Sequence, residues 1–359
     1  MIFKAGVANH VRACRARYLA DSFWKQVRPR PRTLASQAGS GQQMTAGVMY
    51  NWRVAAVHNA LARRGKAEGP LTIEDLTSLG HLDQYHYLGT EACDELIQVL
   101  GLEPGVTVLD VGSGIGGPAR YIAHQSGCSV TGVELQADLA EEATALTKRV
   151  GLQDRVDFLI GDFADVCRSR AVLERFDHVT SLLTFCHFPN RADGLKVSWE
   201  ALKPGGTVFF EDLTLMGPAF TEQEQRDLAE VVGCPSVTSP AVYVEDLQKA
   251  GFVDIEVVDM SAPWKTWTKA RHVGFRQAQE ETVKLHGLSL FESRCAFYEV
   301  IDRLFQGNLG GVRITARKRG VAEEKLYRGR ASTVSTGTTH GTPSLNEFGI
   351  TVDATYSKY

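Results

Sequence analysis

The chain has 359 residues, of which 43% are hydrophobic and 23% are charged, and its formal net charge is −3. This is the composition of an ordinary globular protein, and the charge gives no electrostatic reason to expect a nucleic acid partner. No apolar run approaches the roughly 18 residues of a membrane-spanning helix, so no integral membrane segment is expected.

Seven cysteines occur without a CxxC pair, and ten histidines are scattered without an HxxxH or HExxH pair. An odd number of cysteines in this arrangement is typical of reduced thiols in an intracellular protein. Cys128 and Cys186 stand in apolar surroundings and are expected in the core. The sequence therefore predicts no metal site.

Residues 1–45 differ in kind from the rest of the chain. Basic residues recur from Lys4 to Arg32 with a single acid, Asp21, and apolar residues are interleaved at helix-like spacing. An Arg-rich, acid-poor, amphipathic beginning is typical of an organelle transit peptide. We expect mitochondrial targeting. Plastid targeting, or a cytoplasmic chain with a disordered or membrane-associating basic segment, is the alternative.

Residues 46–100 are expected to form a helical lid. Two helix-like stretches, NWRVAAVHNALAR and TEACDELIQVLGL, flank the aromatic segment DQYHYLG, and Thr90 is a candidate N-cap of the second. Tyr85 and His86 are candidates for lining a pocket, because aromatic faces hold cationic ligands by cation–π attraction. The alternative is that they pack the lid onto the sheet.

The segment VLDVGSGIGGPARY combines a strand that ends at Asp110, a glycine-rich turn and the start of a helix. Glycines let a cofactor lie against bare backbone, and the first N–H groups of the helix favour an anionic group. Gly112, Gly114 and Gly117 also satisfy the dinucleotide pattern GxGxxG, so the glycines alone leave NAD open. Glu134 ends a second strand about 20 residues later, where a carboxylate can hold both ribose hydroxyls of either ligand.

The motifs further along the chain separate these two ligands. DVGSGIGG, VEL, GDF, FDHVTS and LKPGG follow one another in the order and at the spacing seen in class I S-adenosylmethionine (SAM)-dependent methyltransferases, which residues 101–318 therefore resemble. The resemblance implies an α/β fold, with a doubly wound, mostly parallel seven-stranded sheet of the Rossmann-like methyltransferase type. Its last strand would be antiparallel, and a cap insertion would span about 214–243. Residues 319–359 are rich in Ser, Thr and Gly and are expected to form a disordered tail.

The resemblance also implies SAM as cofactor and assigns roles by position. Asp110 and the glycine loop would hold the methionine end, Glu134 would bind the ribose, and Asp162 would accept from the adenine amino group. Asp110 could instead be a turn acid, and Phe163 a core residue. The implied cofactor-binding residues are Asp110, Gly112, Ser113, Gly114, Gly116, Glu134, Leu135, Gln136, Asp162 and Phe163.

Methyl transfer requires a general base only where the acceptor carries a proton that must leave. His187 and the acids Glu211 and Asp212 stand at expected strand ends. His187 could equally be a structural loop residue, and one of the acids could cap the following helix. The catalytic candidates are Tyr85, His86, His187 and Glu211.

DQYHYLG, FFEDL and NLGGVR are similar to sarcosine/dimethylglycine and phosphoethanolamine N-methyltransferase-like enzymes, and more distantly to tocopherol and sterol C-methyltransferases. We expect methyl transfer from SAM to a small molecule, with an amine favoured by the aromatic segment and the acidic pair. A C-, O- or S-methyltransferase of a lipid-like, phenolic or thioether metabolite is the alternative. An NAD-dependent oxidoreductase fits the later motifs poorly, and an inactive assembly factor would have lost SAM residues that are present. The oligomeric state is left open.

Overall fold

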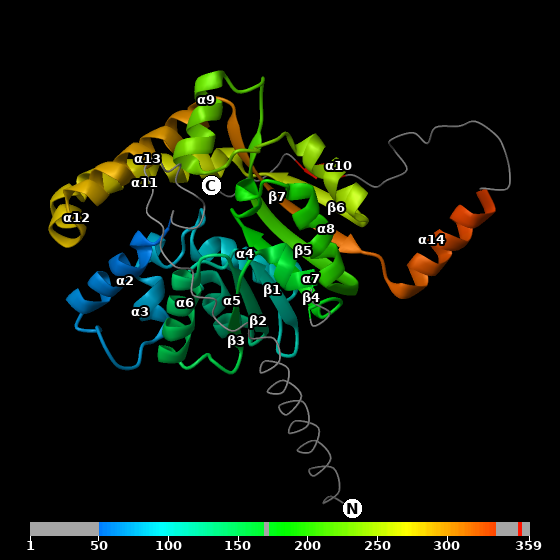
Figure 1. Cartoon of the computed structure of the whole chain (residues 1–359), viewed down its shortest axis with the longest axis horizontal. Helices are drawn as coiled ribbons and strands as arrows, with labels where there is room; N and C mark the ends of the chain where they lie inside the picture. Colours follow the sequence, from blue (N-terminus) through cyan, green and yellow to red (C-terminus); the bar gives the residue numbers. More distant parts are fainter. Residues whose placement is uncertain (1–49, 169–171, 335–350, 354–359) are drawn as a thin grey trace, which may run out of the picture.

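The computed structural model describes residues 50–168, 172–334 and 351–353. The expected transit peptide, residues 1–45, lies outside them. In Figure 1 a central sheet carries helices on both faces, and a group of long helices lies beyond one end of the strands, above the lid. Among the described residues, no helix has the length and apolar character needed to cross a membrane.

The sheet has the order β3-β2-β1-β4-β5-β7-β6-β8. Neighbours from β3 to β5 are parallel, whereas β7 runs antiparallel to both β5 and β6. Apart from β8 (Thr351–Asp353), which adds an eighth strand beside β6, the expected mostly parallel seven-stranded sheet with an antiparallel last strand is therefore confirmed. The seven strands are β1 (Thr107–Val111), β2 (Ser129–Glu134), β3 (Val156–Ile160), β4 (Phe176–Leu182), β5 (Leu202–Leu215), β6 (Phe252–Asp259) and β7 (Leu309–Lys318).

Both faces of the sheet are covered because neighbouring strand residues point to opposite sides. Val108 and Phe209 pack under one set of helices, while Leu109 and Phe210 pack under the other. The first set is α4 (Thr90–Leu100), α5 (Gly117–Ser126) and α6 (Ala137–Arg149); the second is α7 (Phe163–Arg168), α8 (Arg191–Ala201) and α10 (Pro240–Ala250).

The lid consists of α2 (Trp52–Arg63), α3 (Ile73–Thr77), η2 (Gly80–Leu82) and α4. Its connecting segment docks on α5, where Arg120 donates to Asp83 at 2.7 Å and both side chains are buried. Gly89, with a φ of 58°, occupies the N-cap of α4, so the expectation for Thr90 is wrong by one position. Glycine fits there because a positive φ strains other residues.

The cap is larger than expected. Besides α9 (Glu222–Arg226) and η4 (Asp227–Val232), which lie in the expected insertion, three helices join β6 to β7: α11 (Ser261–Gln277), α12 (Gln279–His286) and α13 (Leu288–Gln306). These helices reach the lid, since Arg63 of α2 donates to Glu281 of α12 at 2.8 Å. The boundary of 214–243 thus covers only part of the cap.

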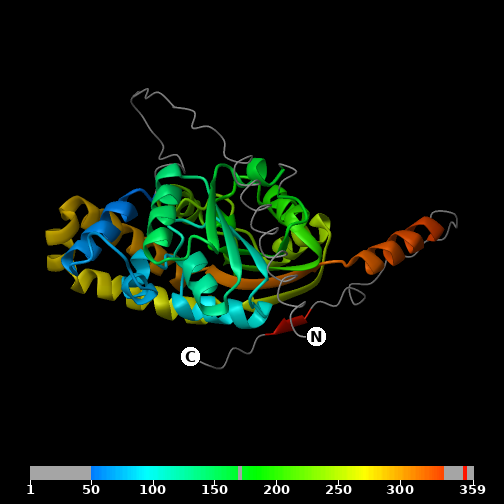
Figure 2. The ribbon, with the colours of Figure 1, turned by 90° about the horizontal axis from the view of Figure 1, so that it is seen from below.

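The tail also departs from the expectation. Residues Val321–Val334 form a helix, α14, which stands away from the sheet in Figure 2, and β8 (Thr351–Asp353) pairs in parallel with β6. The disordered tail expected over 319–359 is therefore wrong for these two segments. The rest of the tail lies outside the described residues.

Candidate active site

A cavity of about 560 Å³ opens at the carboxyl ends of β1, β2 and β4, where open α/β sheets bind ligands. Its floor is the glycine loop, its walls come from the lid and from the loop after β4, and its far side is formed by the cap helices α11 and α13. Within the described residues, the site is thus assembled from three parts of the chain that are distant in sequence.

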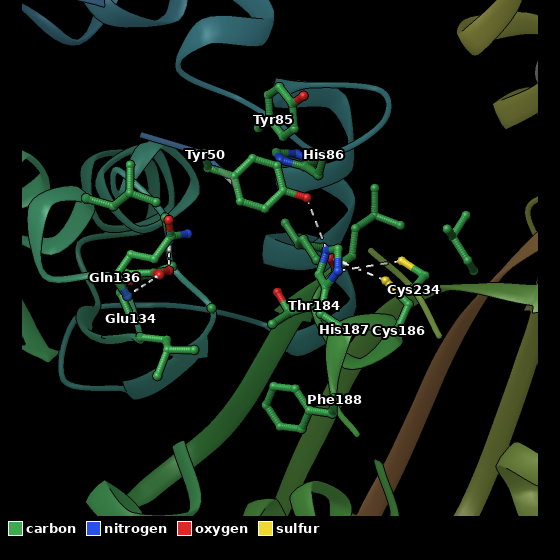
Figure 3. A pocket seen from close by; sticks show the side chains of 18 of the residues that line it. Tyr50, Tyr85, His86, Glu134, Gln136, Thr184, Cys186, His187, Phe188 and Cys234 are labelled. Carbon is green, nitrogen blue, oxygen red and sulfur yellow. Dashed lines mark hydrogen bonds between the residues drawn. The ribbon is translucent and has the colours of Figure 1, made fainter. Parts of the chain in front are cut away.

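The glycine loop approaches the loop after β4 very closely. Gly112 has a φ of 71°, and a Cβ placed on it would come within 2.2 Å of the Thr184 side chain. Glu134 fixes the loop from the next strand: its Oε2 accepts from the Gly114 N–H at 2.9 Å and its Oε1 from the Gln136 N–H at 2.8 Å. Figure 3 shows Glu134 and Gln136 on one side of the cavity and His187 on the other.

Most of the residues assigned to SAM by resemblance line this part of the cavity. Asp162 lies there. Its Oδ1 also accepts a hydrogen bond from the Ala164 N–H at 2.9 Å, at the start of α7. Phe163 is largely buried, which fits a core residue with one edge on the cavity. The cofactor-binding candidates found in the lining are Gly112, Ser113, Gly114, Glu134, Leu135, Gln136, Asp162 and Phe163.

Asp110 and Gly116 do not line the cavity. Gly116 serves as the N-cap of α5 with a φ of 76°. Asp110 is buried beside Thr180, whose hydroxyl donates to Oδ1 at 3.3 Å, and its Oδ2 has no hydrogen-bond partner. Desolvation raises the pKa of Asp110 to about 7. A buried carboxylate oxygen without a partner is suited to a cationic ligand group, such as an amino group, that reaches it through the loop.

The aromatic lid segment contributes Tyr85 and His86 to the cavity, as the sequence predicts. The Tyr85 ring stacks on the His81 ring, with 4.2 Å between the ring centroids. The Arg53 guanidinium also lies over the Tyr85 ring, 4.5 Å from its centroid. His86 Nε2 donates to the Gly89 carbonyl at 2.8 Å, which leaves Nδ1 unpartnered. Burial lowers the pKa of His86 to about 4, so this imidazole is neutral at physiological pH.

His187 faces the cavity from the loop after β4, as expected. Its Nδ1 lies 2.8 Å from the Gly233 carbonyl oxygen, and its Nε2 lies 3.2 Å from the Tyr50 hydroxyl. Burial favours the neutral ring, but Cys186 and, to a smaller degree, the Gly233 carbonyl and Asp212 outweigh it and raise the pKa of His187. A base role therefore requires the imidazole to lose a proton first, which a cationic sulfonium nearby would promote.

The acidic pair lies inside β5, which continues to Leu215, and does not reach the cavity, so the expected role of Glu211 is wrong. Glu211 Oε1 accepts from Arg313 Nε at 2.9 Å, and Arg313 also contacts Glu95 on α4. Asp212 points to the opposite face and accepts from the Cys186 N–H at 3.2 Å. Strand alternation places one acid under α4 and the other under the loop after β4.

Several lining residues were missed because they come from the lid start and the cap. Arg53 reaches the glycine loop, since its NH1 lies 3.2 Å from where a Cβ on Gly114 would stand. It could pair with the carboxylate of a bound SAM. No sequence signal marks these residues, because they are isolated in the chain and only the fold brings them together. They include Tyr50, Arg53, Cys234, Arg271 and Tyr298.

Comparison with known proteins identifies the domain. Residues 109–210 match the family described as "Methyltransferase domain". The chain contains a SAM-dependent methyltransferase domain. Over 247 residues it is 28% identical to erythromycin 3''-O-methyltransferase of Saccharopolyspora erythraea, covering 64% of this chain and 78% of that protein. It is 29% identical to glycine/sarcosine/dimethylglycine N-methyltransferase of Actinopolyspora halophila, covering 45% of this chain and 28% of the relative.

Solved structures show the same fold. Phosphoethanolamine N-methyltransferase 2 of Haemonchus contortus, in complex with phosphomonomethylethanolamine and S-adenosylhomocysteine, superposes with a TM-score of 0.60 at 20% identity. The match covers 70% of this chain and 61% of that one. The cofactor of this methyltransferase is SAM, and its acceptor is a small molecule. The relatives differ in the atom they methylate, so the acceptor has to be argued from the cavity.

Proposed function

We propose that this methyltransferase transfers a methyl group from SAM to the nitrogen of a small amine that also carries an anionic group. The observation that carries this proposal is Arg271 of α11, a half-buried arginine in the wall of the cavity opposite the glycine loop. An anionic group on the acceptor would meet Arg271 and leave the rest of the acceptor directed toward the cofactor.

Arg271 is held in place by an aromatic side chain and has donors to spare. Its NH2 donates to the Tyr298 hydroxyl at 3.3 Å, and its Nε is buried without a partner. A buried donor without a partner costs free energy, and a bound carboxylate or phosphate removes that cost. The amine part rests on the aromatic ring of Tyr50, which lines the cavity and suits a cationic or weakly cationic nitrogen, whereas His81 and Arg53 already cover the ring of Tyr85.

Two of the relatives support this acceptor class. The Actinopolyspora halophila protein is named for glycine, sarcosine and dimethylglycine, and the Haemonchus contortus structure contains phosphomonomethylethanolamine. Each is an amine with one anionic group. The acidic pair that first suggested an amine no longer contributes, because Glu211 and Asp212 lie outside the cavity lining.

The reaction places simple demands on the chain. Bound SAM supplies an electrophilic methyl group on a sulfonium. The lone pair of the acceptor nitrogen forms the new N–C bond while the C–S bond breaks, so the protein must align and desolvate the two reactants. The lid and cap exclude water, and the nitrogen proton leaves to neutral His187 or to solvent.

Substitution of Arg271 tests the proposal. We expect R271A to raise the KM for sarcosine, dimethylglycine or phosphoethanolamine by about 10- to 100-fold, because a hydrogen bond to a charged group contributes roughly 1.5–3 kcal/mol. The dissociation constant of SAM should stay within about twofold. Arg276 lies on the same helix but is exposed, so R276A is the matched control. Turnover of an uncharged phenol or thiol, unaffected by R271A, would contradict the proposal.

We also propose that residues 1–45 direct the chain to mitochondria, on the basis of their basic, amphipathic composition. Fusion of these residues to a fluorescent protein tests this. Co-localisation with a mitochondrial marker is expected, and diffuse fluorescence would contradict it.

A further inference from the structure

Three metal-ligating side chains converge on the wall of the cavity. Cys186 and His187 come from η3 (Phe185–His187), the turn after β4, and Cys234 comes from the segment just after η4. One ligand atom from each lies within 4.8 Å of the other two. Figure 3 shows the His187 ring turned toward both sulfurs. We propose that Cys186, His187 and Cys234 form a binding site for a thiophilic divalent metal ion of the zinc class.

The spacing suits a tetrahedral ion. With Zn–S and Zn–N bonds of about 2.3 and 2.0–2.1 Å, a sulfur and a nitrogen ligand stand about 3.6 Å apart. Cys234 Sγ lies 3.6 Å from His187 Nδ1. Cys186 needs only a small side-chain movement to complete the set, since all three ligand atoms already lie within 4.8 Å.

The outer ring of contacts also suits a metal ligand. A metal-bound imidazole donates its other ring N–H to a neighbouring group, which fixes the ring. His187 Nε2 stands 3.2 Å from the Tyr50 hydroxyl, which can accept that proton. The Cys186 backbone is held by Asp212, because its N–H donates to Oδ1 at 3.2 Å. Tyr50 and Asp212 therefore position two of the three ligands.

The ligand set determines which ion binds and how many positions it leaves open. Two thiolates and one imidazole favour zinc and other soft ions over magnesium or calcium, which take oxygen ligands. All three residues line the cavity, so a fourth position faces the acceptor space. Three protein ligands with one open position are typical of catalytic rather than structural zinc.

Binding of the metal ion displaces protons from the ligand side chains and breaks one hydrogen bond of His187. Each thiol releases its proton to solvent as a thiolate–metal bond forms, so at least two protons leave per ion. His187 Nδ1 releases its proton to solvent and exchanges its hydrogen bond with the Gly233 carbonyl for a metal–nitrogen bond, while Nε2 keeps its proton beside Tyr50. A bound ion would also occupy His187 and take up part of the acceptor space. Metal binding is therefore expected to inhibit methyl transfer to an amine.

The test uses the full-length protein, reduced and freed of metal by a chelator. Titration with zinc against a chromophoric chelator is expected to give one tight site per chain, and cobalt is expected to give a thiolate-to-metal charge-transfer band. The double variant C186S/C234S should lose at least 100-fold in zinc affinity and lose the cobalt band. Y50F should lose about 10-fold, as expected for a group that supports a ligand.

Cys295 provides the matched control, because it lies on α13 outside the cavity lining. C295S should bind zinc as the unmodified chain does. SAM affinity of each variant reports whether the fold is intact, independently of metal binding. Zinc binding unchanged in C186S/C234S, absence of the cobalt band, or no zinc site in a chain that binds SAM would each overturn the proposal. Because the readout is metal binding, its failure leaves the proposed amine methylation standing.

Discussion

At the scale of single residues, Asp110 is a buried carboxylate with an oxygen that is free to bind a ligand group. It is 3% exposed, has one weak partner in Thr180, and keeps one oxygen unpaired. Desolvation raises its pKa to about 7. Burial of the Asp110 carboxylate therefore lowers the stability of the folded chain without SAM, and binding of SAM can restore part of that stability.

Replacement of Asp110 by asparagine tests this. The pKa of Asp110 is higher in the folded chain than its ordinary 3.8, so the folded state binds more protons between pH 4 and 7. The contribution of Asp110 to stability thus falls as the pH rises through this range. D110N should be more stable than the unmodified chain by on the order of 3 kcal/mol at pH 8, with a smaller gain at pH 5.

Denaturant unfolding at both pH values measures the effect, and titration with SAM should show at least a 10-fold loss of affinity. Asp154 is exposed, so D154N serves as the control and should change neither quantity. An equal effect of D110N at pH 5 and pH 8 would show that the carboxylate is not ionising as described.

The residue scale also shows where sequence reasoning worked. Glu134 and His187 could be predicted, because ordered motifs fix which strand each residue follows. Glu211 could not be placed correctly: the motif identifies the strand, but β5 continues to Leu215, and successive residues along it face opposite sides of the sheet. Cys234 carried no signal, since its proximity to His187 exists only after folding.

At the scale of elements, the lid packs on the sheet domain through apolar clusters, and one buried ion pair and one close backbone contact fix its connecting segment. Arg120 donates to Asp83 at 2.7 Å, and a Cβ on Gly117 would come within 2.0 Å of the Asp83 carbonyl oxygen. Gly117 therefore permits the lid segment to lie directly on the start of α5, beside the glycine loop.

Breaking the ion pair should destabilise the chain and loosen the lid. D83A leaves the Arg120 guanidinium buried without its counter-charge, for which we expect a loss of about 3–5 kcal/mol in the free energy of unfolding. The double variant D83A/R120L removes the uncompensated charge and should recover part of this loss. Denaturant unfolding measures both variants. R317A breaks exposed ion pairs and should cost less than about 1 kcal/mol. A double variant less stable than D83A would contradict this account.

The elements that could be predicted are those with a strong periodic or motif signal. The seven strands and the lid helices α2 and α4 follow from apolar patterning. The cap helices α11 and α12 were missed because much of their surface is exposed and polar: α11 buries only Trp264 and Thr268, and α12 buries no residue. Helices of this kind form because they pack on one another and on the lid, and that tertiary support is invisible in a single sequence. Helix α13 does carry a buried stripe at helical spacing, which includes Tyr298, Ile301 and Phe305, and this signal was overlooked.

At the scale of the whole molecule, the cavity lies where the sheet domain, the lid and the cap pack together. The sheet domain supplies the cofactor end, the lid supplies Tyr50, Arg53 and Tyr85, and the cap supplies Arg271 and Tyr298. A ligand that contacts the sheet domain and the lid together must stabilise the folded chain, because it binds the assembled state and not the unfolded one.

Thermal unfolding of the full-length chain provides the corresponding test. SAM at about 100 times its dissociation constant should add roughly 2.7 kcal/mol to the stability of the folded state, which corresponds to a rise in Tm of roughly 5 °C. NADH should give no rise, because the motifs around Glu134 and Asp162 match SAM sites. E134A should abolish most of the SAM effect, since Glu134 lines the cofactor end and holds Gly114 and Gln136 through its two oxygens.

A rise in Tm with NADH and none with SAM would show that the glycine loop binds a dinucleotide. A rise with SAM that persists in E134A would instead show that the cofactor lies elsewhere in the cavity.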